Sequence, residues 1–156
     1  MTGMLASYER LVASGELKPD PDQRRAAERL AALQKELEAE CSGGLFAQWF
    51  ARREQPRGVY LWGGVGRGKS MLMDLFFATA PVERKRRVHF NAFMLEIHDR
   101  LYKEQQEGPR AAEHPMAALA AQIAADAWLL CFDEFQVTNI ADAMILGRLL
   151  EALFAK

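Results

Sequence analysis

The sequence has few cysteines, and they lie far apart. Its 156 residues include two, Cys41 and Cys131. Neither a disulfide framework nor a metal-binding Cys/His spacing can be built from this pair. We therefore expect a reducing compartment, the cytoplasm, as the location of the protein.

The chain also lacks long apolar runs and an excess of one charge. No stretch approaches the roughly 18 uninterrupted apolar residues of a transmembrane helix, and the N-terminal MTGMLASYER has no apolar signal core. The formal net charge is −1, from 20 Lys and Arg against 21 Asp and Glu. Overall charge therefore predicts no attraction to nucleic acid or anionic lipid. We expect no nucleic-acid partner and no integral membrane segment.

What the sequence does contain is an alternation of strand-like and helix-like segments. The expected strands are RGVYLW at 57–62, the start of RRVHFNAF at 86–93 and the apolar run WLLCF at 128–132. The expected helices follow these strands or lie between them, and the last covers residues 139–154. Alternation of this kind predicts an α/β fold in which helices cover both faces of a parallel sheet, a three-layer sandwich.

A long amphipathic helix is expected ahead of this α/β region. Asp20 can cap it, Pro21 suits its first position, and Gln23 would complete a capping box with Asp20. Ala26, Leu30, Leu33 and Leu37 recur on one face, and CSGG at 41–44 would end the helix. We therefore predict an N-terminal helical segment over residues 1–55 and a separate α/β core over residues 56–156.

A glycine-rich loop joins the first strand to the next helix. Residues 63–70, GGVGRGKS, match the pattern G-x-x-x-x-G-K-[ST] in full. Such a loop turns successive backbone N–H groups toward a polyphosphate, and the following helix adds its positive N-terminal dipole. A glycine turn that binds nothing is the alternative, but the position between strand and helix favours the phosphate site. The predicted nucleotide-binding residues are Gly63, Gly64, Val65, Gly66, Arg67, Gly68, Lys69, Ser70 and Met71.

Two acids end the apolar strand at 128–132 and provide a second catalytic element. Asp133 would hold Mg²⁺ together with the hydroxyl of Ser70, and Lys69 would reach the β- and γ-phosphates. Glu134 would orient or deprotonate a water that attacks the γ-phosphate. Two acids placed at a strand end for solubility are the alternative, and the complete loop upstream favours the catalytic interpretation. The predicted catalytic residues are Glu134 and Lys69, and the cofactors are ATP and Mg²⁺.

The acid pair also favours one reaction type over others. A small-molecule kinase does not need a water-activating glutamate beside its metal-binding aspartate. A GTPase would carry an N-K-x-D motif for the base, which this sequence lacks. ATP hydrolysis is therefore the preferred reaction, and phosphotransfer to another acceptor is a weaker alternative.

At this level of detail the sequence resembles the ZapE family of cell-division ATPases, whose mitochondrial relatives are also P-loop ATPases of the AAA+ type. The resemblance rests on GVYLWGGVGRGKSMLMDLFF, ERKRRVHFNAFMLEIHDRL and LLCFDEFQVTNIADAMILGRLLEALF, and on the N-terminal stretch YERLVASGELKPDPDQRRAAERLAAL. It implies an ATPase with a role in bacterial division, FtsZ or other division proteins as partners, and a homo-oligomer. The family's motifs fall on Gly63, Gly66, Gly68, Lys69, Ser70, Asp133 and Glu134.

The resemblance also implies elements that this chain does not carry. Family members continue with a strand bearing a sensor residue, an arginine finger and a second sensor. The additional strand lies between the P-loop strand and the strand that ends at Asp133, so its absence would leave backbone groups unpaired. We therefore expect a truncated core with weak or no ATPase activity. A nucleotide-binding or interaction module without turnover is the alternative function.

Two further features have both a functional and a structural interpretation. His89 or Asn91, after the second strand, could restrain the catalytic glutamate as AAA+ sensor residues do, but a structural polar role is favoured. The basic run at 84–87 could bind nucleic acid or a partner, but a solvated edge before the strand is favoured.

Overall fold

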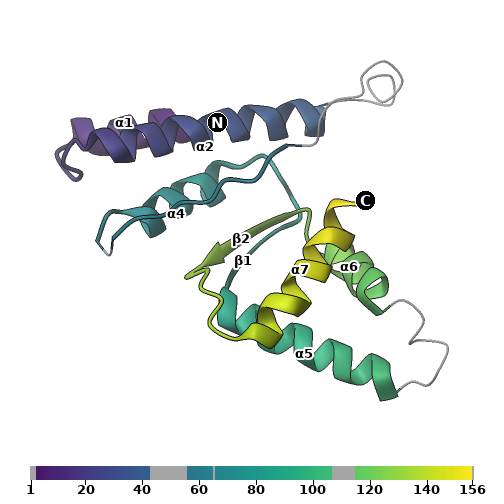
Figure 1. The fold of residues 1–156 in the computed structure, drawn as a ribbon. Coiled ribbons are helices and arrows are strands. Elements are labelled where there is room, and N and C mark those ends of the chain that lie inside the picture. Colours follow the sequence, from purple (N-terminus) through teal and green to yellow (C-terminus); the bar gives the residue numbers. More distant parts are fainter. Residues whose placement is uncertain (1–2, 43–55, 65, 107–114, 156) are drawn as a thin grey trace. The chain divides into compact units, whose positions relative to one another are not determined.

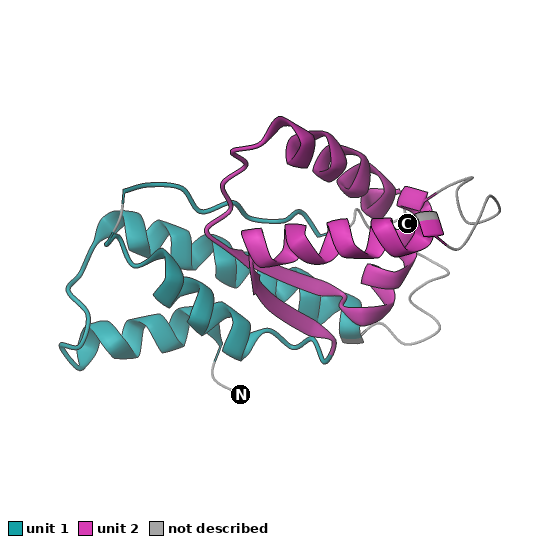
Figure 2. Cartoon of the chain, turned by 90° about the horizontal axis from the view of Figure 1, so that it is seen from below, with its two compact units in different colours: residues 1–83 teal, residues 84–156 magenta. Residues whose placement is uncertain are grey.

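The computed structural model describes residues 3–42, 56–64, 66–106 and 115–155. It divides into two compact units, residues 1–83 and residues 84–156 (Figures 1 and 2). The predicted domain boundary at residues 55 and 56 adjoins residues 43–55, which lie outside the described part, and stays a prediction.

The described residues of unit 1 form the helices α1 (Met4–Ala13), α2 (Pro21–Ser42) and α4 (Lys69–Thr79), which pack on one another. A buried hydrogen bond joins the first two, because the backbone N–H of Met4 donates to Oε1 of Gln34 at 2.8 Å. The apolar side of the three helices forms the core of the unit. Its buried apolar side chains include Met4, Tyr8, Ala27, Leu30, Leu33, Leu37, Leu72 and Phe76.

The start of α2 confirms part of the predicted capping box. Oδ1 of Asp20 accepts hydrogen bonds from the backbone N–H groups of Asp22 at 2.8 Å and Gln23 at 3.3 Å. These two bonds lower the pKa of Asp20, with a smaller contribution from Arg67. The second half of the box is wrong, because Oε1 of Gln23 is buried without a hydrogen-bond partner. The Gln23 side chain instead lies against Gly68.

The predicted strand at residues 57–62 is also wrong. These residues have no regular secondary structure, and Tyr60 and Trp62 expose 67% and 84% of their surface. A strand exists only when another strand pairs with its backbone. In the described part of the chain the sheet has two strands, and they pair with each other. Local β-propensity at 57–62 is therefore not sufficient to form a strand there.

Unit 2 is built on this parallel pair, β1 (Lys85–His89) and β2 (Leu129–Asp133). The register places His89 opposite Asp133 and Arg87 opposite Cys131. The two strands confirm the predictions for the segments at 86–93 and 128–132. The protein is therefore a mixed α/β structure with a parallel sheet, while a three-layer sandwich stays a prediction.

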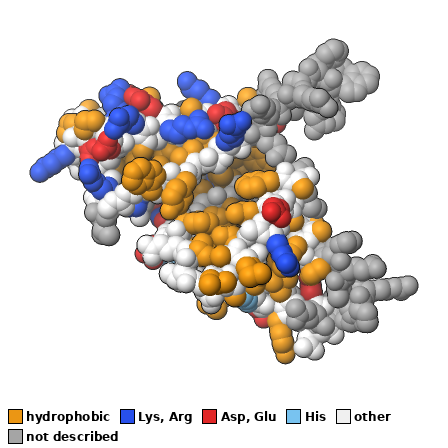
Figure 3. Space-filling view, in the orientation of Figure 1, with side chains coloured by type: hydrophobic (Ala, Val, Ile, Leu, Met, Phe, Trp, Pro, Cys, Tyr) orange, Lys and Arg blue, Asp and Glu red, His pale blue; other side chains and the backbone are white. Residues whose placement is uncertain are grey.

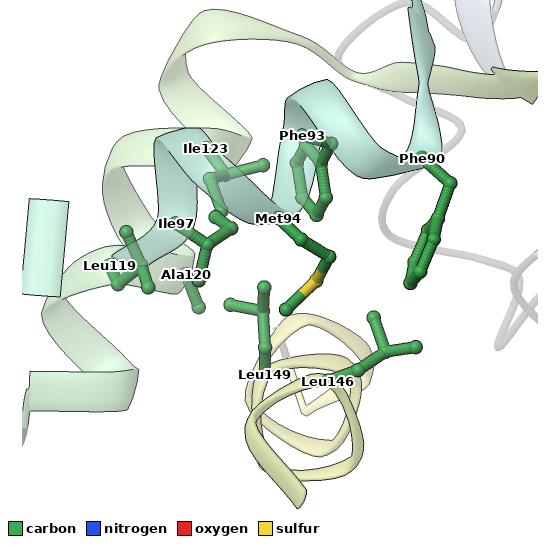
Figure 4. Packing of buried hydrophobic residues seen from close by; sticks show 9 residues of the cluster. All are labelled: Phe90, Phe93, Met94, Ile97, Leu119, Ala120, Ile123, Leu146 and Leu149. Carbon is green, nitrogen blue, oxygen red and sulfur yellow. The ribbon is translucent and has the colours of Figure 1, made fainter. Parts of the chain in front are cut away.

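Three helices of unit 2 bury one face of this sheet. They are α5 (Phe90–Gln106), α6 (Pro115–Asp126) and α7 (Ile140–Phe154), the last of which lies close to its predicted range of 139–154. Figure 4 shows the side chains that meet between them, and Val88, Leu130 and Phe132 from the strands pack against the same cluster. The cluster consists of Phe90, Phe93, Met94, Ile97, Leu119, Ala120, Ile123, Leu146 and Leu149.

The opposite side of α7 stays apolar but exposed. Ile140 and Met144 expose 80% and 60% of their surface, and Phe154 near the end of the helix is similar. Figure 3 shows hydrophobic side chains gathered over the part of unit 2 that contains this helix. No described helix is both long and apolar enough to cross a bilayer.

The basic run at 84–87 is not a solvated edge. Arg86 pairs with Glu96 of α5, and this contact lowers the pKa of Glu96. Arg87 pairs with Asp133, and Nη1 of Arg84 donates to the carbonyl of Ala125 at 2.7 Å. Since β1 alternates its side chains between two faces, these cations are distributed between the helices and the neighbouring strand.

Candidate nucleotide-binding site

The glycines of the loop adopt backbone conformations that other residues avoid. Gly63, Gly66 and Gly68 have φ angles of 139°, 80° and 75°. At Gly63, Gly64 and Gly66 an added β-carbon would meet nothing within 4 Å. Glycine is therefore required at positions 63 and 66 by conformation, and the space beside the loop is open. Val65 lies outside the described residues.

Lys69 folds over this loop. Its Nζ donates hydrogen bonds to the carbonyl oxygens of Gly63 at 2.8 Å and Gly64 at 2.7 Å. These bonds hold the ammonium group at the loop itself, next to the backbone that would surround a phosphate. The lysine thus provides a positive charge at the loop.

The loop ends at the start of α4, which provides further N–H groups. Gly68 occupies the cap position and has no side chain with which to cap the helix, and Lys69, Ser70 and Met71 form its first turn. The first N–H groups of a helix have no acceptor within the helix, and they carry its positive dipole. Ser70 is exposed, so its hydroxyl is accessible to a ligand.

Helix α2 supports the loop from the side. A β-carbon on Gly68 would lie 3.1 Å from Nε2 of Gln23. Nη1 of Arg67 lies 3.5 Å from Oδ2 of Asp20 and 4.0 Å from Oδ2 of Asp22. The residues that start α2 therefore contact the last part of the loop, and the sequence pattern of the loop alone does not indicate this.

The two predicted acids lie at the end of β2 in unit 2. Asp133 is the last residue of the strand, and its side chain is 12% exposed. Arg87 of β1 binds it with two hydrogen bonds, from Nε to Oδ2 at 2.6 Å and from Nη2 to Oδ1 at 3.2 Å. This bond to Asp133 raises the pKa of Arg87. The candidate metal-binding carboxylate is thus held by a cation that the sequence analysis did not assign to the site.

Glu134 follows Asp133 in a strained conformation. Its φ is 52°, the left-handed region that non-glycine residues rarely adopt. The side chain is exposed, while Phe135 packs its ring 4.6 Å from that of Phe90 in the core. The chain therefore turns sharply at Glu134, so that Phe135 returns to the core and the carboxylate stays accessible. Strain of this kind is typical of functional positions.

The two sensor candidates lie at the end of β1. His89 is exposed and lies opposite Asp133 in the register, and Asn91 is exposed in the first turn of α5. Register thus brings His89 to the same sheet edge as Asp133. A role for either residue in restraining Glu134 stays a prediction.

The donor atoms suit the predicted cofactor. A hydroxyl and a carboxylate are hard oxygen ligands of the kind that Mg²⁺ prefers, with water completing its coordination. Among the described residues, no group of three or more His, Cys, Asp or Glu side chains could hold a metal by itself. A cation at Asp133 would therefore need further oxygen ligands, from a bound molecule and from water.

Comparisons with a family model and with individual known proteins both find sequences related to this chain. A model of the AFG1-like ATPase family matches residues 2–156. The cell division protein ZapE of Escherichia coli K12 is 40% identical over 164 residues, which cover 97% of this chain and 42% of the relative. The lactation elevated protein 1 homolog B of Danio rerio is 50% identical over 105 residues, 64% of this chain and 21% of the relative.

These relatives are much longer than the chain described here, which spans less than half of either. No solved structure matches the chain. The family model extends over nearly every residue of the chain. Its match therefore includes both the glycine-rich loop and the acids at the end of β2.

Proposed function

The chain belongs to the AFG1-like ATPase family, and we propose that it binds ATP with Mg²⁺ through the loop at residues 63–70. One observation carries this proposal. The loop has three glycines with positive φ, is closed by the ammonium group of Lys69 and leads directly into a helix start. An anion bound there would receive N–H groups, a helix dipole and a full positive charge together.

Each residue of the site then has a defined task. Backbone N–H groups of residues 63–71 surround the phosphates, and Lys69 turns from the loop carbonyls to the β- and γ-phosphates. Ser70 and Asp133 would hold Mg²⁺, directly or through its water. Mg²⁺ held there would supply positive charge that neutralises the phosphate oxygens.

We further propose that the reaction is hydrolysis, with Glu134 as the group that accepts a proton from water. Its carboxylate is exposed and follows the metal-binding Asp133, which suits a general base for an incoming water. The protein would act as an ATPase of the AAA+ type, in a homo-oligomer, with an arginine from a neighbouring subunit completing the site.

The second candidate is a nucleotide-binding module without turnover. The observation that favours it is the irregular backbone at residues 57–62, directly before the loop. A loop that is not anchored to a sheet can bind phosphate but does not hold it in line with a water molecule. On this proposal ATP binds and hydrolysis is weak or absent.

A cellular role follows from the relatives only as a proposal. The Escherichia coli relative is named as a cell division protein. We propose that this chain also acts in division, in the cytoplasm, and that FtsZ is a candidate partner.

The decisive experiment is equilibrium binding of ATP with Mg²⁺ to the chain, with Lys69→Ala as the control. Micromolar binding that is lost in Lys69→Ala supports both candidates, because each requires the loop. A Glu134→Gln variant then separates them: retention of unhydrolysed ATP beside turnover by the unmodified chain supports the ATPase. Binding by the unmodified chain and by Lys69→Ala alike would contradict the assignment of the loop.

A further inference from the structure

We propose that Arg87 controls metal binding at Asp133, by competing with Mg²⁺ for the carboxylate. This inference rests on the proposed function, since it concerns the same candidate metal ligand. Arg87 acts through Asp133 and is therefore a positioning residue. No known catalytic motif of the chain includes it.

The geometry of the pair carries the argument. Nε of Arg87 donates to Oδ2 of Asp133 at 2.6 Å, and Nη2 donates to Oδ1 at 3.2 Å. Both oxygens of the carboxylate are therefore engaged by one planar guanidinium, the arrangement that gives the strongest arginine–carboxylate pairs. An ionised carboxylate has about four lone-pair sites, so the remaining ones can still accept hydrogen bonds from metal-bound water.

Charge makes the two cations compete. The side chains of Arg87 and Asp133 are 30% and 12% exposed, so water screens their attraction less than it would on the surface. Together they present no net charge to an approaching cation. Mg²⁺ must bind beside a guanidinium or displace it. Either event makes the free energy of Mg²⁺ binding less favourable than binding to an unpaired carboxylate.

The sheet explains why this pair forms. Arg87 lies opposite Cys131 in the register, and Asp133 lies two residues further along β2 on the same face. Of the other side chains of this face, His89 lies at the same end as Asp133, and Lys85 and Leu129 lie at the opposite end of the strands. Arg86 projects to the other face, where it pairs with Glu96. Two adjacent arginines thus have separate carboxylates, which provides a matched control within the chain.

The test measures the Mg²⁺ requirement of nucleotide binding. A fluorescent mant-ATP probe is titrated into the chain in EDTA and then at increasing Mg²⁺. Mg²⁺ should strengthen binding of the probe, and half of this effect is reached at a characteristic Mg²⁺ concentration. For Arg87→Gln we expect that concentration to fall, on the order of three- to tenfold, because one positive charge near the metal is removed. Affinity in EDTA should stay within about twofold, since Arg87 does not belong to the phosphate loop.

Four variants isolate the cause. Arg87→Lys keeps the charge and should keep the Mg²⁺ requirement of the unmodified chain. In Asp133→Asn, added Mg²⁺ should no longer strengthen probe binding. Combining Asp133→Asn with Arg87→Gln should leave probe binding the same as in Asp133→Asn alone. Arg86→Gln removes an equal charge from the opposite face and should leave the requirement unchanged. Circular dichroism checks that each variant is folded.

A second measurement does not depend on how Arg87→Gln folds. In the unmodified chain, the ¹H–¹⁵N signal of the Arg87 Nε–H group, assigned with Arg87→Lys, should shift when Mg²⁺ is added to the mant-ATP complex. An unchanged signal at saturating Mg²⁺ would overturn the proposal, and so would a Mg²⁺ requirement that stays the same or rises in Arg87→Gln. Absence of probe binding by every variant would overturn the proposed function, and this inference with it.

Discussion

Gln23 of α2 and Gly68 of the phosphate loop are in direct contact, because Nε2 of Gln23 lies 3.1 Å from the point where a β-carbon on Gly68 would be. Gly68 also has a φ of 75° and immediately precedes α4. The positive φ therefore favours glycine there, and a β-carbon would in addition require the end of the Gln23 side chain to move. The N-terminal helices therefore support the shape of the loop.

The first prediction is that Gly68→Ala destabilises the fold and weakens ATP binding. The left-handed conformation should cost about 1–2 kcal/mol of unfolding free energy. Gly147→Ala is the matched control, since Gly147 lies within α7 with open space around it. Because alanine is the better helix former, this control should gain about 0.5–1 kcal/mol. Urea unfolding measures both, and effects of the same sign would contradict the described geometry.

The second prediction concerns Glu134, whose φ is 52°. Glu134→Gly should raise the unfolding free energy by about 1 kcal/mol, because glycine adopts this conformation without strain. Glu134→Gln keeps the strain and should leave stability unchanged, while both variants should lack turnover. Thermal unfolding and phosphate release test the pair. Equal stability of the two variants would mean that the position is not strained.

The third prediction concerns the core of unit 2. Leu149 of α7 is fully buried among the helices (Figure 4), so Leu149→Ala should cost about 3 kcal/mol of unfolding free energy through lost burial and a cavity. Met144 lies on the same helix but is 60% exposed. Met144→Ala should therefore change stability by less than about 0.5 kcal/mol. Similar losses in urea unfolding for both variants would place Met144 in a core as well.

The fourth prediction distinguishes the two thiols. Burial raises the pKa of Cys131 to about 11, whereas Cys41 is exposed on α2. Since the thiolate is the reactive form, iodoacetamide at pH 8 should modify Cys41 first and leave Cys131 until the chain is unfolded. Peptide mass spectrometry after timed quenching identifies the modified residue. Equal rates for the two cysteines in the folded chain would contradict the burial of Cys131.

The fifth prediction is a pH dependence at the start of α2. The pKa of Asp20 is lowered from 3.8 by the backbone N–H groups of Asp22 and Gln23. The ionised form therefore stabilises the folded state above the unfolded pKa, and this contribution disappears as the pH falls through the lowered value. The stability difference between the unmodified chain and Asp20→Asn should be constant near neutrality and shrink below about pH 4. A difference that grows on acidification would reverse the assigned sign.

Local patterns were sufficient to predict the strands and the last helix of unit 2 and half of the cap of α2. The uninterrupted apolar run before Asp133 indicates a buried strand by itself. Asp20 caps α2 through bonds to residues two and three positions ahead, and Asn139 caps α7 in the same way, although that cap was not predicted. Hydrogen bonds of this range join residues that are close together in the sequence, so local sequence patterns are enough to predict them.

Pairing over longer distances could not be predicted in the same way. Residues 57–62 have strand composition, yet a strand depends on a partner that local propensity does not specify. Arg87 meets Asp133 because of a register between segments 46 positions apart, and a shift by one residue would have separated them. The Gln23 contact with Gly68 depends likewise on how α2 packs on α4.

The division of the chain at residues 83 and 84 has a consequence for its synthesis. Unit 1 is complete before the first residue of unit 2 leaves the ribosome, so the phosphate loop can acquire its shape while the acids are still untranslated. The sheet of unit 2 forms later, because β1 cannot pair until its partner β2, which begins at Leu129, has been synthesised. Domains fold in order as they emerge from the ribosome. During part of translation Arg87 therefore lacks the Asp133 carboxylate with which it forms an ion pair in the finished chain.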